Sequence, residues 1–145
     1  MSPLQLFIQG WLAEPARWGV SDCCLSALDW AGQVRGIDLT EDLRLTYEDA
    51  AQAQRVTRFF TQPLRLASEI LEGRAGLRPS REAVRGDVAV FKLFHPGRGQ
   101  VMPVAGICIA PGVFVCRGEP GGQAPMHSVR PERILRAWEV GYDGA

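Results

Sequence analysis

The spacing of apolar residues changes from helical to strand-like near residue 86, and that change limits the folds open to this chain. Before Gly86, apolar residues recur every three or four positions, as they do from Leu4 to Leu12. After Gly86, short runs rich in Val, Ile and Phe are separated by turn signals such as Pro111-Gly112. Helices that precede the strands, rather than alternate with them, predict an α+β fold with N-terminal helices packed on one side of an antiparallel β-meander.

Local start and stop signals set the expected bounds of these elements. The expected helices cover residues 3–13, residues 22–34 after a cap at Ser21 or Asp22, the stretch from a capping-box-like Thr46–Asp49 to about 60, and 63 to a stop at Gly73. The expected strands cover 87–94, 101–110, 113–116, 126–130 and 136–142, with Trp138 facing inward. Residues 74–85 are expected to form an arginine-rich connection, and residues 131–135 one helical turn.

Size and charge narrow the class of protein. The chain has 145 residues, which suits a single domain over 1–145 with one core. Sixteen basic residues balance sixteen acidic ones, so neither nucleic acid nor an anionic membrane surface is an expected partner. No run is long enough for membrane insertion, and residues 1–13 lack the basic start of a signal peptide. We therefore expect synthesis and folding in the cytoplasm.

The four cysteines do not form a recognisable metal motif. Cys23 and Cys24 are adjacent, so their side chains leave a helix in different directions, and the paired ligand knuckles of a zinc site are missing. We predict reduced thiols, with no metal and no cofactor, and expect Cys24 in the core. Cys108 and Cys116 flank the Pro111-Gly112 turn and can be cross-strand neighbours. A metal site shared with a partner chain stays open as an alternative.

Four motifs occur in an order that resembles the NlpC-type, papain-like cysteine peptidases. They are Trp18-Gly19 with Asp22-Cys23-Cys24-Leu25, Gly86-Asp87-Val88-Ala89-Val90-Phe91, Val104-Ala105-Gly106-Ile107-Cys108 and Ala137-Trp138. The set is similar to small phage-encoded or prophage-encoded domains of this superfamily that are found among tail genes. The resemblance spans nearly the whole chain and implies an NlpC-type fold with Cys23 in the place of the nucleophile. A cysteine in the first turn of a helix is also where the dipole favours a thiolate.

The same resemblance places Val104 where the peptidases carry their catalytic histidine. The following strand supplies Phe114, Val115 and Cys116 where an orienting polar residue belongs. Nucleophilic catalysis requires a base beside the thiol and a group that orients the base, and these positions offer neither. We therefore interpret Cys23 first as a structural residue. Of the two histidines, His127 is the better candidate for a relocated base, and His95 the weaker one.

Two functions follow as hypotheses. The first is a structural component of a phage tail tip or baseplate, resident in the virion and in contact with distal-tail and hub proteins. The alternative is an active cell-wall cysteine peptidase or amidase that uses Cys23 and His127 on bacterial peptidoglycan, with backbone N–H groups at the helix start as the oxyanion site. A third, weaker hypothesis is a cytoplasmic assembly factor. The arginine-rich connection is either a solvated loop or a docking surface for an acidic partner.

Overall fold

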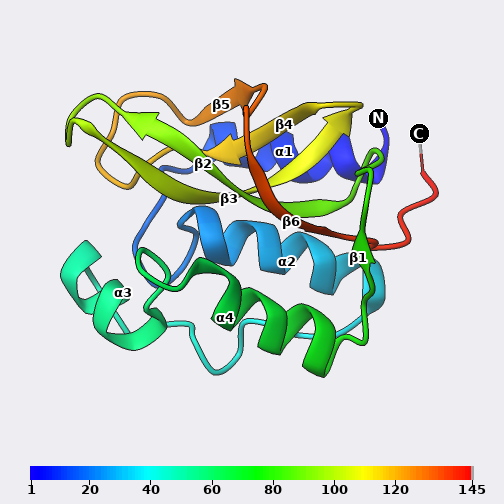
Figure 1. The fold of residues 1–145 in the computed structure, drawn as a ribbon, viewed down its shortest axis with the longest axis horizontal. Helices are drawn as coiled ribbons and strands as arrows, with labels where there is room; N and C mark the ends of the chain where they lie inside the picture. Colours follow the sequence, from blue (N-terminus) through cyan, green and yellow to red (C-terminus); the bar gives the residue numbers. More distant parts are fainter. Residues whose placement is uncertain (145) are drawn as a thin grey trace.

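A computed structural model describes residues 1–144, and its fold is α+β (Figure 1). The helices come first along the chain and are α1 (Pro3–Ala13), α2 (Cys23–Arg35), α3 (Ala50–Thr57), α4 (Pro63–Ser68) and the π-helix η1 (Glu69–Arg74). In Figure 1, α2 lies between the sheet and α4, whereas α3 stands apart at one side. The order of helices before strands is thus confirmed.

Side-chain caps begin α1, α2 and α3, whereas α4 and η1 begin without one. Ser2 forms a full capping box with Gln5 at the start of α1, and Asp22 accepts from the backbone N–H of Leu25 at the start of α2. Gly36 ends α2 in the left-handed conformation, at φ 71°. The expected capping box at Thr46 is wrong, because Asp49 caps α3 directly and the helix ends at residue 57.

Gly73 does not stop the fourth helix, which is a further correction. The chain continues from α4 into η1 as far as Arg74, with an i→i+5 bond from the Ala75 N–H to the Ile70 carbonyl. Glu72 in this π-helix accepts hydrogen bonds from the Trp138 indole, at 3.0 Å, and from the Arg136 guanidinium, at 3.1 Å. Two hydrogen bonds therefore join the π-helix to the last strand of the sheet.

The sheet in the described part of the chain has six antiparallel strands in the order β1-β6-β2-β3-β4-β5. Their bounds are β1 (Pro79–Ser80), β2 (Val88–His95), β3 (Gln100–Ala110), β4 (Val113–Arg117), β5 (Met126–Val129) and β6 (Ile134–Trp138). Strands β2 to β5 form the expected meander, but β6 crosses back to pair with β2 instead of extending it.

The last strand also overturns two local expectations. No helical turn forms over residues 131–135, because Ile134 already pairs with Phe91 of β2. Pairing with β2 buries Trp138 completely and gives its indole a carboxylate partner, a long-range gain that outweighs a weak local helix signal. The short strand β1, inside the segment expected to be only a connection, pairs in turn with β6.

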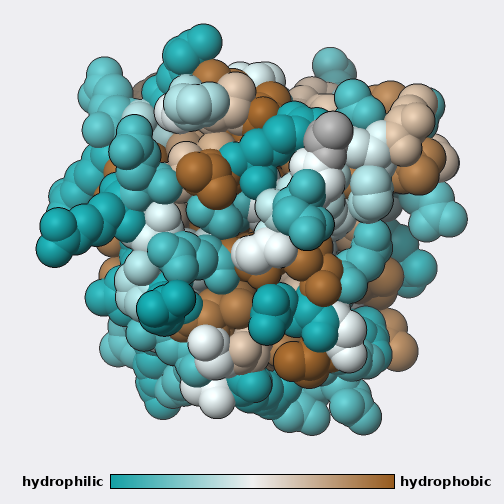
Figure 2. All heavy atoms as spheres, turned by 90° about the vertical axis from the view of Figure 1, so that its right-hand side faces the viewer, coloured by the Kyte–Doolittle hydropathy of each residue, from teal (hydrophilic) through white to brown (hydrophobic). Residues whose placement is uncertain are grey.

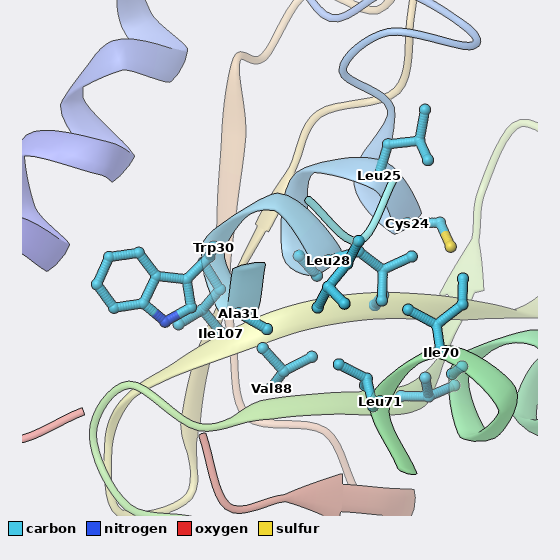
Figure 3. Packing of buried hydrophobic residues seen from close by; sticks show 14 of the residues in the cluster. Cys24, Leu25, Leu28, Trp30, Ala31, Ile70, Leu71, Val88 and Ile107 are labelled. Carbon is cyan, nitrogen blue, oxygen red and sulfur yellow. The ribbon is translucent and has the colours of Figure 1, made fainter. Parts of the chain in front are cut away.

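The core lies mainly between the helices and one face of the sheet. Figure 3 shows Leu28 and Ala31 of α2 beside Val88 of β2 and Ile107 of β3, with Leu71 of η1 below them. A smaller cluster fills the other face of the sheet and is made of Ala89, Phe91, Cys108, Phe114, Cys116 and Ala137. Both faces of the central strands are therefore buried.

The four cysteines differ in which core cluster, if any, they join. Cys24 belongs to the main core, as expected, and all four cysteines are free thiols. Cys108 and Cys116 share the second face but are not cross-strand partners, because Cys108 lies opposite Phe114 and Cys116 opposite His127. The two thiols are therefore diagonal neighbours on the same face of β3 and β4 and do not lie directly opposite each other.

The face of the molecule on the side of the chain termini carries apolar residues in small patches separated by polar ones (Figure 2). Isolated exposed apolar residues of this kind are normal for a folded domain. No helix in residues 1–144 has the length and hydropathy needed to cross a bilayer.

Candidate functional site

The carboxylate of Asp22 organises the chain around the start of α2. Asp22 is buried, at 3% exposure, and accepts three hydrogen bonds: from the N–H groups of Gly19 and Leu25, at 3.0 and 3.1 Å, and from the Tyr47 hydroxyl, at 2.8 Å. Burial and this negative charge raise the pKa of Tyr47 far above its usual range, so the phenol stays a donor. The aspartate of the Asp-Cys pair is therefore a structural hub that joins α2 to the loop before α3.

Gly19 is required by the same arrangement. It adopts φ +75°, and a Cβ at this position would lie 2.1 Å from the carbonyl oxygen of Tyr47. Any side chain here would push the Tyr47 segment away from the helix start. The glycine ahead of the Asp-Cys pair thus has a packing reason that is independent of catalysis.

Cys23 is the first residue of α2 and is partly exposed, whereas its neighbour Cys24 is buried. Burial of the sulfur raises the pKa of Cys23 to about 12, with a smaller rise from the Asp22 carboxylate and a partial offset from a backbone hydrogen bond at Ala105. The helix start alone would lower the pKa of a thiol. Here desolvation and the adjacent carboxylate dominate, so the thiol stays protonated at neutral pH.

Cys23 lies on the wall of a cleft of about 790 Å³. The wall is assembled from the start of α2, from α3 with the following Phe59 and Phe60, from the distal ends of β2 and β3 with their connecting turn, and from β4, β5 and the loop between them. Trp18, Phe94, Met102 and Met126 contribute further apolar surface to it. These elements can share one wall because the start of α2 lies on the same side of the molecule as α3 and the β2–β3 hairpin (Figure 1).

The positions that the resemblance assigns to a catalytic base and its partner only partly face this cleft. Val104 lines it, and of the three residues on the following strand Cys116 lines it, whereas Phe114 and Val115 are buried elsewhere. The Cys116 thiol also makes a minor contribution to the raised pKa of Cys23. Neither side chain can take a proton from the Cys23 thiol at neutral pH, since burial raises the pKa of Cys116 to about 11.

Both histidines line the cleft as well, but within residues 1–144 no hydrogen bond joins either of them to Cys23. His95 forms a 2.9 Å pair with Glu119, which also lies 3.6 Å from the guanidinium of Arg98. This pairing ties the turn between β2 and β3 to the loop between β4 and β5. His127 is exposed and lies opposite Cys116 in the ladder between β4 and β5.

Arg117, at the end of β4, is a wall residue that the sequence analysis missed. Its side chain is 8% exposed, its guanidinium lies 5.8 Å from the centre of the Trp11 ring, and one terminal nitrogen donates to the Glu14 carbonyl. No carboxylate in the described residues forms an ion pair with it, and its Nε has no hydrogen-bond partner. Strand alternation from the buried Val115 predicts this inward position and is the signal that could have revealed it.

The arginine-rich connection and the cysteines were the remaining candidates for a binding or metal site. Among the described residues, no three His, Cys, Asp or Glu side chains gather closely enough to hold a metal ion. In the connection, Arg74 pairs with Asp42, and Arg78 lies 3.8 Å from Glu139. Arg85 donates to the Ile109 carbonyl, so three of the arginines in this segment have partners within the chain.

One comparison with known proteins finds a relative. A family described as a domain of unknown function (DUF6950) matches residues 2–140, and the chain belongs to this family. No curated protein and no solved structure is significantly similar to it.

Proposed function

We propose that this member of the DUF6950 family is a non-catalytic relative of the NlpC-type cysteine peptidases and serves as a structural component of a phage tail tip or baseplate. In this role it resides in the virion and contacts neighbouring tail proteins, such as the distal-tail and hub proteins. The observation that carries the proposal is the state of Cys23: a protonated thiol on the wall of a cleft that is also lined by Val104 and Cys116.

The peptidase ancestry is supported by the relative positions of the motifs in space. The resemblance requires the cysteine at a helix start beside the strand that carries Val104-Ala105-Gly106-Ile107. Cys23 begins α2, and its sulfur lies near the backbone of Ala105 in that strand. Residues 82 positions apart in the chain therefore lie side by side, and this proximity supports the proposed ancestry.

The absence of a working base supports loss of the chemistry. An active thiol needs a general base within about 3 Å and a group that orients the base. The two histidines of residues 1–144 are His95, which is paired with Glu119, and His127, which is exposed, and neither forms a hydrogen bond with Cys23. The Asp22 carboxylate raises the pKa of Cys23 instead of activating it.

The proposal is tested in the phage or prophage that encodes the chain. Purified particles are probed by immunolabelling in the electron microscope, and three genotypes are compared: wild type, a deletion, and Cys23→Ser. We expect label at the tail tip, defective tails in the deletion, and normal assembly and infectivity in Cys23→Ser. A protein that is needed for assembly but missing from mature particles would instead be an assembly factor. Normal tails without the protein would refute a structural role.

The alternative function, an active cell-wall peptidase or amidase, is favoured by one observation: both histidines lie on the same cleft wall as Cys23. The discriminating assay is release of peptide fragments from purified peptidoglycan by wild type, Cys23→Ser and His127→Ala. Release that both substitutions abolish would establish the peptidase and remove the basis of the non-catalytic proposal.

A further inference from the structure

Arg117, on the wall of this cleft, is a buried cation that forms no ion pair in residues 1–144, and the charge of Glu14 acts on it only from beyond ion-pair distance. Four other charged or ionisable groups on the wall have partners within the chain. Asp22 accepts three hydrogen bonds, and Glu119 pairs with both His95 and Arg98. The Arg117 guanidinium contacts a backbone carbonyl and the face of Trp11, and the charge of Glu14 offsets only part of the lowering of its pKa by burial. A buried guanidinium without a directly paired carboxylate is a costly arrangement, which an incoming anion would relieve.

Unused hydrogen-bonding capacity points in the same direction. Two buried side-chain nitrogens in residues 1–144 have no hydrogen-bond partner: Nε of Arg117 and Nδ1 of His95. Both residues line this cleft. The Arg117 Nε–H can only donate, so the group that satisfies it must supply an acceptor oxygen.

An open strand edge runs along the same wall. All four residues of β5 (Met126–Val129) line the cleft, and β5 is the last strand of the sheet, paired in the described chain with β4 alone. A free edge presents backbone N–H and C=O groups to which an extended segment can add as a further strand. The aromatic and methionine side chains across the cleft would bury the apolar residues of such a segment.

We propose that the cleft binds an extended, apolar peptide segment of a partner protein, and that a carboxylate of this segment pairs with Arg117. The segment adds along β5 and places its apolar side chains against residues such as Phe60 and Phe94. The inference rests on the proposed function in one respect, since it takes the cleft as a place where peptides are held and not cut. A carboxylate pairs with a guanidinium through two parallel hydrogen bonds, which makes Arg117 the main determinant of specificity.

The test uses the full chain and a library of random heptapeptides displayed on their messenger RNA. Selected sequences are synthesised, and their affinity is measured by calorimetry. We expect selected peptides to combine apolar residues with at least one Asp or Glu. For the best peptide, replacing that acid with its amide, or replacing Arg117 in the protein, should each weaken binding at least ~30-fold. The two changes together should weaken it little further, because they remove the same interaction.

Matched variants separate a lost contact from a lost fold. Phe94 lines the cleft and Leu12 does not, and both side chains are 62% exposed. Phe94→Ser should weaken binding about 10-fold, and Leu12→Ser should leave it unchanged. If Arg117→Gln lowers the melting temperature, the amide-substituted peptide on the wild-type protein still measures the carboxylate contribution.

Several results would overturn the inference. The selection could enrich no peptide, or only peptides without an acidic residue. Phe94→Ser and Leu12→Ser could weaken binding equally. The cleft could bind decanoate, a probe with an alkyl chain and a carboxylate, while it binds no peptide. Self-association of the chain through this cleft, seen by sedimentation and abolished by Phe94→Ser, would overturn it in favour of a second copy. Mass spectrometry of the bound peptide keeps the two proposals apart. A peptide that binds through Arg117 and is then cleaved would support the binding site and refute the non-catalytic function.

Discussion

The reactivity of Cys23 toward iodoacetamide is the most direct consequence of its surroundings. With the pKa raised to about 12, about one thiol in ten thousand is ionised at pH 8, against about a quarter for an unperturbed cysteine of pKa ~8.5. This difference in thiolate population lowers the alkylation rate roughly 2,000-fold. A more basic thiolate is intrinsically more nucleophilic, and a Brønsted coefficient of about 0.4–0.5 recovers roughly 40-fold. The expected rate at pH 8 is therefore about 50-fold below that of a free cysteine.

The pH profile is more informative than the single rate. Without a base, the rate should rise about tenfold for each pH unit from about 7 to 10, because the thiolate fraction rises by that factor below the pKa. An ion pair between Cys23 and a histidine would instead give a plateau near neutral pH. The rate is measured by mass spectrometry of the labelled peptide, with circular dichroism as a check that the fold persists at each pH.

Two variants complete this experiment. Cys23→Ser should remove the signal, since the other three cysteines are buried. In that background, Gln33→Cys places an exposed thiol on the same helix and supplies the unperturbed reference. A plateau at neutral pH, or a rate that falls at least tenfold in His127→Ala, would refute the reasoning and favour the peptidase.

Three further predictions concern stability and ancestry. Gly19→Ala should lower the free energy of unfolding by at least about 2 kcal/mol in urea titrations, because Gly19 has a positive φ and an added methyl would overlap the Tyr47 carbonyl. The control Gly10→Ala, in which nothing lies within 4 Å of the added methyl, should raise the free energy of unfolding by about 0.5–1 kcal/mol. Equal effects of the two substitutions would contradict the packing role of Gly19. Hydrogen bonds from the indole and guanidinium of β6 lower the pKa of Glu72, so its contribution to stability is complete above its unfolded pKa of about 4.3 and is lost as the pH falls through the lower folded value. Glu72→Gln should therefore flatten the decline in melting temperature on acidification, and an unchanged slope would exclude this carboxylate as a cause. Val104→His should speed the alkylation of Cys23 at pH 7 at least tenfold if residue 104 occupies the place of a base, and no change would weaken the NlpC-type assignment.

Much of the helical half was predictable because its signals act within one turn. Ser2 and Asp22 accept from N–H groups three residues ahead, and Gly36 takes a conformation that few other residues tolerate. The hairpin at Pro111-Gly112 has the same local character. The sequence was also enough to place Cys23 at a helix start and to separate it from the buried Cys24.

The cleft wall depended on contacts that no local signal records. The pairing of β6 with β2 joins residues more than 40 positions apart, and the loop that carries Tyr47 meets the start of α2 only in the folded chain. Arg117 entered the wall through strand alternation, and its lack of a carboxylate partner could be seen only once every neighbour was in place.

The sequence by itself determined the helix caps, the order of helices before strands and the presence of a cysteine at the start of α2. The tertiary structure decided the chemical state of that cysteine. A helix start favours a thiolate, but burial of the Cys23 sulfur and the carboxylate of Asp22 raise its pKa instead. The physical reason is the distance along the chain over which each effect acts. Capping is a property of neighbouring residues, whereas desolvation depends on every element that packs around the sulfur.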